Sequence, residues 1–457
     1  MKQRERLGSR LGFILLSAGC AIGLGNVYRF PIITGSYGGA IFVLIYIGFL
    51  LLLGLPIMTA ELSVGRASQR SIATSFDSLE RRGQKWHLMK YLGIGANYLL
   101  MMCYTTITGW MVIYFGKYLT GSIMSAQTSD EIGAVFKSML ADPWTSLATT
   151  LCVIVACFLI CSVGLQKGVE RITKTMMIAL LALMVCLVVY SLTLDKAGEG
   201  LKFYLIPSLD GIKEYGLGTV VSAAMGQAFF TLSLGIGSIA IFGSYIGKER
   251  RLAGEAATII SLDTAVALMA GLIVFPACFT YNGGVTADAG SVGPAFLFTT
   301  LSSIFNAMPA GRVVGTFFFL FMTFAAASTV IAVFENIISF WMELTSLKRW
   351  QIALINIGLI GILSLPAVFS NNLLSDVTFF GMTFMDLEDW MVSNLMLPFG
   401  SLIYVIFCTS RYGWGWKRFY AEANCGDRGL RLPKWVRPYM AYVLPLIILV
   451  VMLMSIL

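Results

Sequence analysis

Eleven apolar stretches, most of about 20 residues or more, constrain the fold of this 457-residue chain more than any other feature. An α-helix of that length crosses the hydrocarbon core of a bilayer, where irregular backbone is not stable against lipid. The composition, with 57% hydrophobic and 12% charged residues, is also typical of helical membrane proteins. We therefore predict an all-α polytopic membrane protein with eleven transmembrane helices, at residues 11–35, 39–64, 89–120, 146–164, 174–195, 217–246, 252–281, 311–343, 350–369, 386–409 and 438–457.

The basic residues predict the orientation in the membrane. The segments on one side of the predicted spans hold 25 of the 32 lysines and arginines: 1–10, 66–90, 165–174, 248–251, 344–349 and 410–437. Cytoplasmic segments carry such an excess, so the N-terminus is predicted in the cytoplasm and the C-terminus outside the plasma (inner) membrane. The net charge of +8 then reflects topology and not a nucleic-acid partner.

Several functional classes are disfavoured by what the sequence lacks. His87 is the only histidine, which excludes multi-histidine metal sites and a serine, histidine and aspartate triad. No GxxxxGK[ST] phosphate loop occurs, and most of the nine cysteines lie in apolar runs, so no disulfide framework is implied. We expect neither an enzyme nor an organic cofactor.

Two of the predicted spans carry signs of interruption. The run GCAIGLGNVYRFP, at 19–31, has three glycines, an amide and an arginine inside an apolar stretch, and GQAFFTLSLGIG, at 226–237, favours a break near Thr231 to Gly235. Unwound backbone at membrane depth marks binding sites in secondary transporters, although glycines in the first run also fit close helix packing. Breaks in spans one and six favour an inverted repeat within a single domain, 1–457, with repeats at 11–195 and 217–409 and an additional helix at 438–457.

Polar side chains inside other spans are candidates for the same site. Asp263 lies in the middle of an apolar span, where a carboxylate needs a cation or a proton, or serves only to tie helices together. Ser328 and Thr329 are adjacent hydroxyls in another span, and they fit either ion binding or hydrogen bonds to their own helix. Glu61 and Glu335 are expected to bond to freed backbone of spans six and one.

The motifs resemble the neurotransmitter:sodium symporter family. Besides the two interrupted runs, CYTTITGW at 103–110, GPAFLFTTL and MPAG within 293–311, and DLEDWMVSNLMLP at 386–398 match that family in order along the whole chain. Bacterial amino-acid transporters with eleven helices look most similar. The resemblance implies a leucine-transporter-like fold of five plus five inverted helices, with helices one and six broken.

The resemblance also implies two sodium sites. In the first, the ion is bound by Ala21, Asn26, Thr231 and Asp263 together with the substrate carboxylate. In the second, the ligands are carbonyls of Gly19, Ile22 and Ala325 and the hydroxyls of Ser328 and Thr329. The implied substrate pocket consists of Cys20, Ala21, Leu24, Gly25, Leu100, Tyr104, Phe229, Phe230, Thr231, Ser233, Ile236, Thr329 and Val333.

The same resemblance suggests the substrate and the gates. Carriers of amines have an aspartate where Gly23 stands, so an amino acid with its own carboxylate is expected, and Ile236 favours aromatic or large aliphatic side chains. Ala267, where chloride-dependent members have serine, implies chloride-independent transport. Arg29 and Asp389 form the implied outer gate, and Arg4 and Glu343 the inner gate.

The function that follows is sodium-coupled import of neutral hydrophobic L-amino acids by alternating access, in a chain whose partners are the substrate and the lipid bilayer. Proton-coupled or uncoupled transport on the same fold, with Asp263 as the proton carrier, remains an alternative. A sensor that binds an amino acid without transporting it is a second alternative. Oligomeric state is left open.

Overall fold

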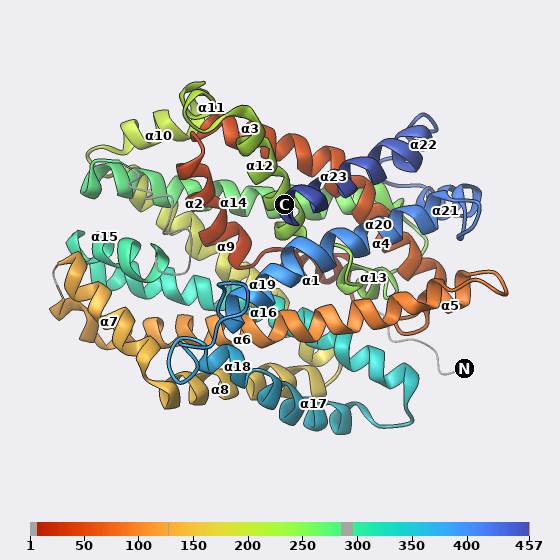
Figure 1. Ribbon diagram of the computed structural model, residues 1–457, viewed down its shortest axis with the longest axis horizontal. Helices are drawn as coiled ribbons and strands as arrows, with labels where there is room; N and C mark the ends of the chain where they lie inside the picture. The colour runs from red at the N-terminus through yellow and green to blue at the C-terminus, as the bar shows by residue number, and fades with distance from the viewer. Residues whose placement is uncertain (1–6, 127, 285–295, 457) are drawn as a thin grey trace.

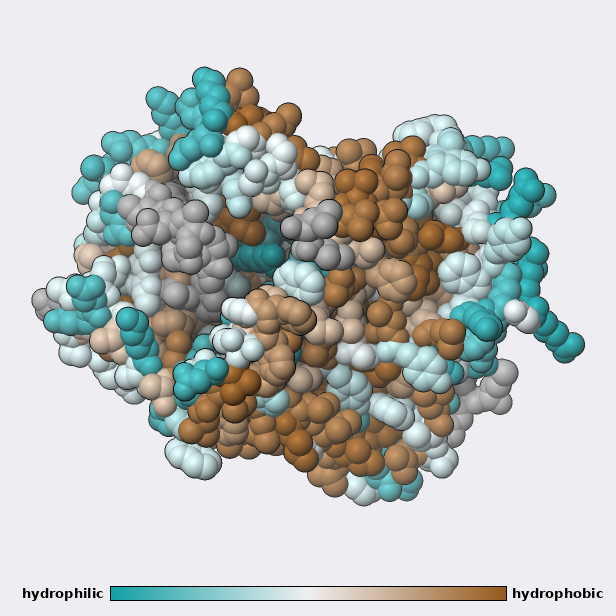
Figure 2. Space-filling model, in the orientation of Figure 1, coloured by the Kyte–Doolittle hydropathy of each residue, from teal (hydrophilic) through white to brown (hydrophobic). Residues whose placement is uncertain are grey.

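The computed structural model describes residues 7–126, 128–284 and 296–456. In these ranges the regular structure is helical, apart from two isolated β-bridges. Among the described residues, nine continuous helical spans are long and apolar enough to cross a membrane (Figure 1): Ala40–Ser68, Trp86–Thr120, Pro143–Ser162, Leu165–Leu192, Leu252–Asn282, Gly311–Leu344, Arg349–Phe369, Phe384–Thr409 and Val436–Met454. A band of apolar surface separates hydrophilic ends on the visible face of the molecule (Figure 2).

Four of these nine spans contain a π-helical turn, and one begins with a 3-10 turn. The elements of the nine spans, in chain order, are α3 (Ala40–Phe49), η2 (Leu50–Gly54) and α4 (Leu55–Ser68); η3 (Trp86–Leu88) and α6 (Met89–Thr120); α8 (Pro143–Ser162); η5 (Leu165–Glu170) and α9 (Arg171–Leu192); α14 (Leu252–Asn282); α16 (Gly311–Leu344); α17 (Arg349–Leu363) and α18 (Leu365–Phe369); α19 (Phe384–Trp390), η7 (Met391–Met396) and α20 (Leu397–Thr409); and α22 (Val436–Pro438), η8 (Tyr439–Val443) and α23 (Leu444–Ile456). The π-helical turns are η2, η5, η7 and η8, and the 3-10 turn is η3.

The first and sixth predicted spans are both interrupted. The first consists of α1 (Arg10–Ala21), then η1 (Gly25–Arg29) with α2 (Phe30–Ser36), and its two halves are bent by 59°. The sixth is divided into α12 (Leu217–Leu232) and α13 (Ser238–Gly243), so the range 217–246 is not one helix. The two breaks agree with the prediction from the glycine-rich runs, while the count of eleven crossings stays a prediction.

Short helices occupy the connections outside the spans. Three long loops hold several of them, and a further two lie at the opposite end of the molecule, the end that holds α22 (Figure 1). These elements are η4 (Ser122–Ser125), α7 (Ser129–Ala141), α10 (Ala197–Leu205), α11 (Asp210–Tyr215), η6 (Phe296–Leu301) and α15 (Ser302–Ala307), and then α5 (Ser75–Leu79) and α21 (Trp416–Ala423). Most of the loop motif at 293–311 is described, but residues 293–295 lie outside the described ranges.

Candidate functional site

The break in the first span is stabilised by side chains from the same span and from α6. Ile22 leaves the helix with an extended backbone, φ −71° and ψ 101°. The freed amide of Gly23 donates to Asn26 Oδ1 at 3.1 Å, and that of Leu24 donates to the Tyr104 hydroxyl at 2.9 Å. Because these amides are satisfied from within the protein, the non-helical backbone is tolerated at membrane depth.

The break in the sixth span depends on two buried polar side chains. Ser233 ends α12 in the left-handed region, at φ 48°, which is strained for a residue other than glycine. The Glu61 carboxylate of α4 accepts from the amides of Gly235 at 2.9 Å and Ile239 at 3.2 Å. Asn97 of α6 donates to the Ile236 carbonyl at 2.9 Å. The expectation that Glu61 would bond to freed backbone of the sixth span is therefore confirmed.

Three of the four residues expected at the first sodium site form one buried cluster. Asp263 is fully buried, and its Oδ1 accepts from Asn26 Nδ2 at 2.8 Å. Its Oδ2 accepts from the Thr231 hydroxyl at 3.3 Å. Ala21, the fourth, lines the adjoining cavity. In the described part of the chain, no lysine or arginine forms an ion pair with Asp263, so the carboxylate needs a bound cation or a proton.

The groups expected at the second sodium site all converge between α1 and α16. Ser328 donates to the carbonyls of Gly19 at 3.1 Å and Ala325 at 2.9 Å. Thr329 reaches the Gly19 carbonyl at 3.1 Å and the Ile22 carbonyl at 3.3 Å. Both hydroxyls thus bond across to the broken helix as well as to their own helix. Five hard oxygens in one place are the kind of ligand set that an alkali cation prefers.

A small cavity lies between the two breaks. Nine of the thirteen residues expected to contact substrate line it, and so do Gly23 and Leu397: Cys20, Ala21, Gly23, Gly25, Leu100, Tyr104, Phe230, Thr231, Ser233, Thr329 and Leu397. Its free volume of about 20 Å³ is room for about one water molecule. A larger molecule enters only if a lining side chain moves.

The other four expected contact residues are buried but are not part of the cavity lining. Leu24, Phe229, Ile236 and Val333 are all at most 3% exposed and do not line the cavity. Leu24 contacts the cavity lining through its backbone amide, which donates to the Tyr104 hydroxyl. Leu397 lies within the predicted motif of the tenth span, at 386–398, but nothing in the sequence marked it as a cavity residue, because an unremarkable leucine acquires this position only through tertiary packing.

Both expected outer gate residues belong to the described ranges, and they form no ion pair with each other. The Arg29 guanidinium carbon lies 4.1 Å from the centre of the Phe230 ring, which lines the cavity. Asp389 accepts from the Ser393 hydroxyl at 3.4 Å. A cation over an aromatic face at this distance is attractive, so Arg29 holds Phe230 over the site.

At the opposite end, one of the expected inner gate residues is outside the described residues. That residue is Arg4. Glu343 accepts from the Ser71 amide at 2.6 Å and from the Thr74 hydroxyl at 2.7 Å. For Glu335, the expected bond to freed backbone of the first span is wrong, because its carboxylate instead accepts from the Tyr245 hydroxyl at 2.8 Å and pairs with Arg349.

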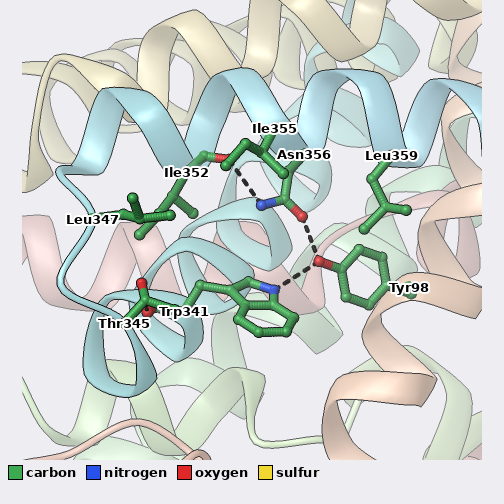
Figure 3. A pocket seen from close by; sticks show the side chains of 8 residues that line it. All are labelled: Tyr98, Trp341, Thr345, Leu347, Ile352, Ile355, Asn356 and Leu359. Carbon is green, nitrogen blue, oxygen red and sulfur yellow. Dashed lines mark hydrogen bonds between the residues drawn. The ribbon is translucent and has the colours of Figure 1, made fainter.

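A more open cavity of about 280 Å³ lies between α6, α16 and α17 (Figure 3). Its polar groups bond to one another: Trp341 Nε1 donates to the Tyr98 hydroxyl at 2.8 Å, and that hydroxyl donates to Asn356 Oδ1. The Asn356 amide in turn donates to the Ile352 carbonyl at 2.8 Å. None of the residues expected to bind substrate or sodium lines it, so it is not the predicted site.

Two broken spans that present backbone oxygens, a buried carboxylate and a closed cavity together define a secondary transporter. Comparison with known proteins gives the same class. The model of the sodium:neurotransmitter symporter family matches residues 4–135 and 136–457. The chain belongs to this family, whose members are sodium-coupled transporters and not enzymes.

Individual relatives agree with this assignment. An uncharacterized sodium-dependent transporter of Bacillus subtilis, YhdH, is 34% identical over 87% of this chain and 86% of its own length. The mouse sodium-dependent neutral amino acid transporter B(0)AT2 is 26% identical over 60% of this chain and 40% of its own. The crystal structure of MhsT in complex with L-phenylalanine matches with a TM-score of 0.86 and 35% identity, over 99% of this chain and all of that one. The fold is therefore leucine-transporter-like, in a multi-pass membrane protein.

Proposed function

We propose that this transporter couples sodium to the import of neutral hydrophobic L-amino acids. One observation carries the substrate class: the corner made by Gly23, Tyr104 and the Leu24 amide. The Tyr104 hydroxyl accepts from that amide, so its own proton is free to be donated to a substrate carboxylate. A side chain at 23 would fill this corner, because a Cβ there would lie 2.2 Å from the Tyr104 oxygen and 2.8 Å from Thr329 Oγ1.

The remaining cavity wall supports a neutral substrate. No charged side chain lines the cavity, so a charged substituent would be buried without a partner. Cys20, Leu100, Phe230 and Leu397 make most of the wall apolar. The L-phenylalanine in the MhsT structure and the neutral amino acids in the name of the mouse relative support the same choice for this chain. Among neutral side chains we propose aromatic or large aliphatic ones.

Two sodium ions are proposed as cotransported cargo. The first would lie among Asn26, Thr231 and Asp263 beside the cavity, where the substrate carboxylate adds a ligand. The second would replace the hydroxyl protons of Ser328 and Thr329 as the partner of the Gly19 and Ile22 carbonyls. Transport would then move a bundle of spans one, two, six and seven against a scaffold formed by the other spans. The protein would lie in the plasma membrane with its N-terminus in the cytoplasm.

Sodium-dependent binding tests the proposal directly. Radiolabelled L-phenylalanine should bind the detergent-purified protein in sodium and not in potassium, and a panel of unlabelled amino acids should rank aromatic and large aliphatic competitors first. Asp263→Asn removes the carboxylate of the first site and should raise the sodium concentration needed for half-maximal binding. Binding that is equal in sodium and potassium would support coupling to protons or no coupling, and binding without counterflow in proteoliposomes would support a sensor.

Chloride independence is proposed from the environment of the first sodium site. Ala267 is fully buried on α14, one turn after Asp263, and offers no hydroxyl to an anion. The fixed carboxylate of Asp263 supplies the negative charge there. Uptake in proteoliposomes should therefore keep its rate when gluconate replaces chloride, and a rate that collapses in gluconate would refute this part of the proposal.

A further inference from the structure

A second binding site is suggested by a basic pocket at the end of the molecule that holds α5, α21 and α22 (Figure 1). The pocket measures about 480 Å³ and is lined by Thr409, Ser410, Trp414, Gly415 and Trp416 together with five cations, Arg81, Arg411, Lys417, Arg418 and Arg437. No carboxylate lines it. Hydrophilic side chains gather over this end of the molecule (Figure 2).

The cations of this pocket lack protein counter-charges. Among the described residues, none of the five cationic side chains forms an ion pair or a hydrogen bond, and Arg81 bonds to Gln84 only through its backbone. Between residues 409 and 440 the chain has seven lysines and arginines but only Glu422 and Asp427 as acids. Glu422 is already paired with the buried Arg66 at 2.6 Å. Like charges that share one hollow repel each other, so an anion that enters the pocket is stabilised.

The pocket is built by packed elements and not by loose side chains. Trp86 donates its indole N–H to the Tyr412 carbonyl at 2.7 Å and packs on Phe407 at 5.4 Å between ring centroids. This contact holds the loop that contains Arg81 against the loop after α20. The helix α21 starts at Trp416 in the pocket without a side-chain cap, so its first amides add to the attraction for an anion.

The surroundings place the pocket at the membrane surface. It lies where α20 ends and α22 begins, at the same end of two spans. Tyr412 is 80% exposed and Trp435 is 73% exposed beside it, and aromatic residues of this kind lie at the level of lipid headgroups. A free phosphate ion would use the same cations but would not need the aromatic neighbours.

We propose that this pocket binds the phosphate headgroup of an anionic phospholipid in the leaflet that faces it, predicted to be the cytoplasmic one. Basic pockets between transmembrane helices on the cytoplasmic side have the charge and position that such headgroups require. The site is separate from the substrate cavity and shares no residue with it.

The test uses the full-length protein in detergent with dioleoyl phosphatidylglycerol or dioleoyl phosphatidylcholine, followed by native mass spectrometry of retained lipid. Lys417→Gln/Arg418→Gln is the test variant. Arg431→Gln/Lys434→Gln, which removes two exposed cations from the same segment outside the pocket, is the matched control. Each cation near an anionic headgroup contributes about fivefold in affinity, so the test variant should bind phosphatidylglycerol roughly 30-fold more weakly.

The control variant should retain as much phosphatidylglycerol as the wild type does. All three proteins should retain equal amounts of phosphatidylcholine. Equal loss in both variants would mean that the segment attracts lipid only by diffuse charge, and would overturn the proposal. A second arm adds about 10 mM inorganic phosphate, roughly ten times the Kd of a weak, millimolar anion site. If phosphate displaces phosphatidylglycerol completely, the site is one for a free anion, and the lipid assignment is wrong.

Discussion

Gly23→Ala is predicted to weaken substrate binding strongly while the protein still folds. The new Cβ would lie 2.2 Å from the Tyr104 oxygen, so that hydroxyl must retreat by about 1.2 Å to reach the 3.4 Å of an ordinary contact. Its hydrogen bond with the Leu24 amide, now 2.9 Å long, would then be lost. A buried hydrogen bond left unmade costs about 1–3 kcal/mol, and overpacking costs a similar amount.

The two costs together come to about 2–6 kcal/mol, which corresponds to binding that is weaker by roughly 30-fold or more. The assay is saturation binding of radiolabelled L-phenylalanine at saturating sodium. Gly226→Ala is the matched control, because a Cβ at that position of α12 meets nothing within 4 Å. If Gly23→Ala binds within threefold of the wild type, the assignment of this corner to the substrate carboxylate is wrong.

Two further predictions concern the second sodium site and a buried ion pair. Ser328→Ala removes one hydroxyl of the proposed second sodium site and should raise the sodium concentration for half-maximal binding at least about fivefold. Thr323→Val should leave that concentration unchanged, because the Thr323 hydroxyl bonds to the Phe319 carbonyl of its own helix at 2.7 Å. Equal shifts in the two variants would contradict the proposed site. Arg66→Met leaves the partly buried Glu422 unpaired and should lower the free energy of unfolding by about 3–5 kcal/mol, while Arg66→Met/Glu422→Met should recover most of it. Thermal unfolding in detergent measures both variants, and a double variant no more stable than the single would show that the bonds of Arg66 to carbonyls dominate.

The sequence allowed the membrane class, most of the spans and both interruptions to be predicted, because lipid leaves few backbone choices. Glycines and polar groups inside apolar runs indicated where the helices end at Ala21 and Leu232. The clustering of Asn26, Thr231 and Asp263 came from the family resemblance, since these residues are far apart along the chain.

Other features depended on packing that no local pattern encodes. The position of Leu397 in the cavity wall arises only when α20 packs across the break of the sixth span, where a Cβ on Gly235 would meet the Leu397 carbonyl at 2.3 Å. The partners of Glu335 were predicted wrongly because its carboxylate has Tyr245 and Arg349 within reach. The expected Arg29 and Asp389 pair is not formed, since the guanidinium has an aromatic face available.

The carboxylate of Glu61 has a consequence for how the molecule moves. It belongs to α4 but takes the place of the missing helical acceptors for Gly235 and Ile239. Any displacement that moved α4 away from α13 would leave those two amides without a hydrogen-bond acceptor, because the membrane interior has no water to replace the carboxylate. The second and sixth spans are therefore coupled, and they must move together in any conformational change of the transport cycle.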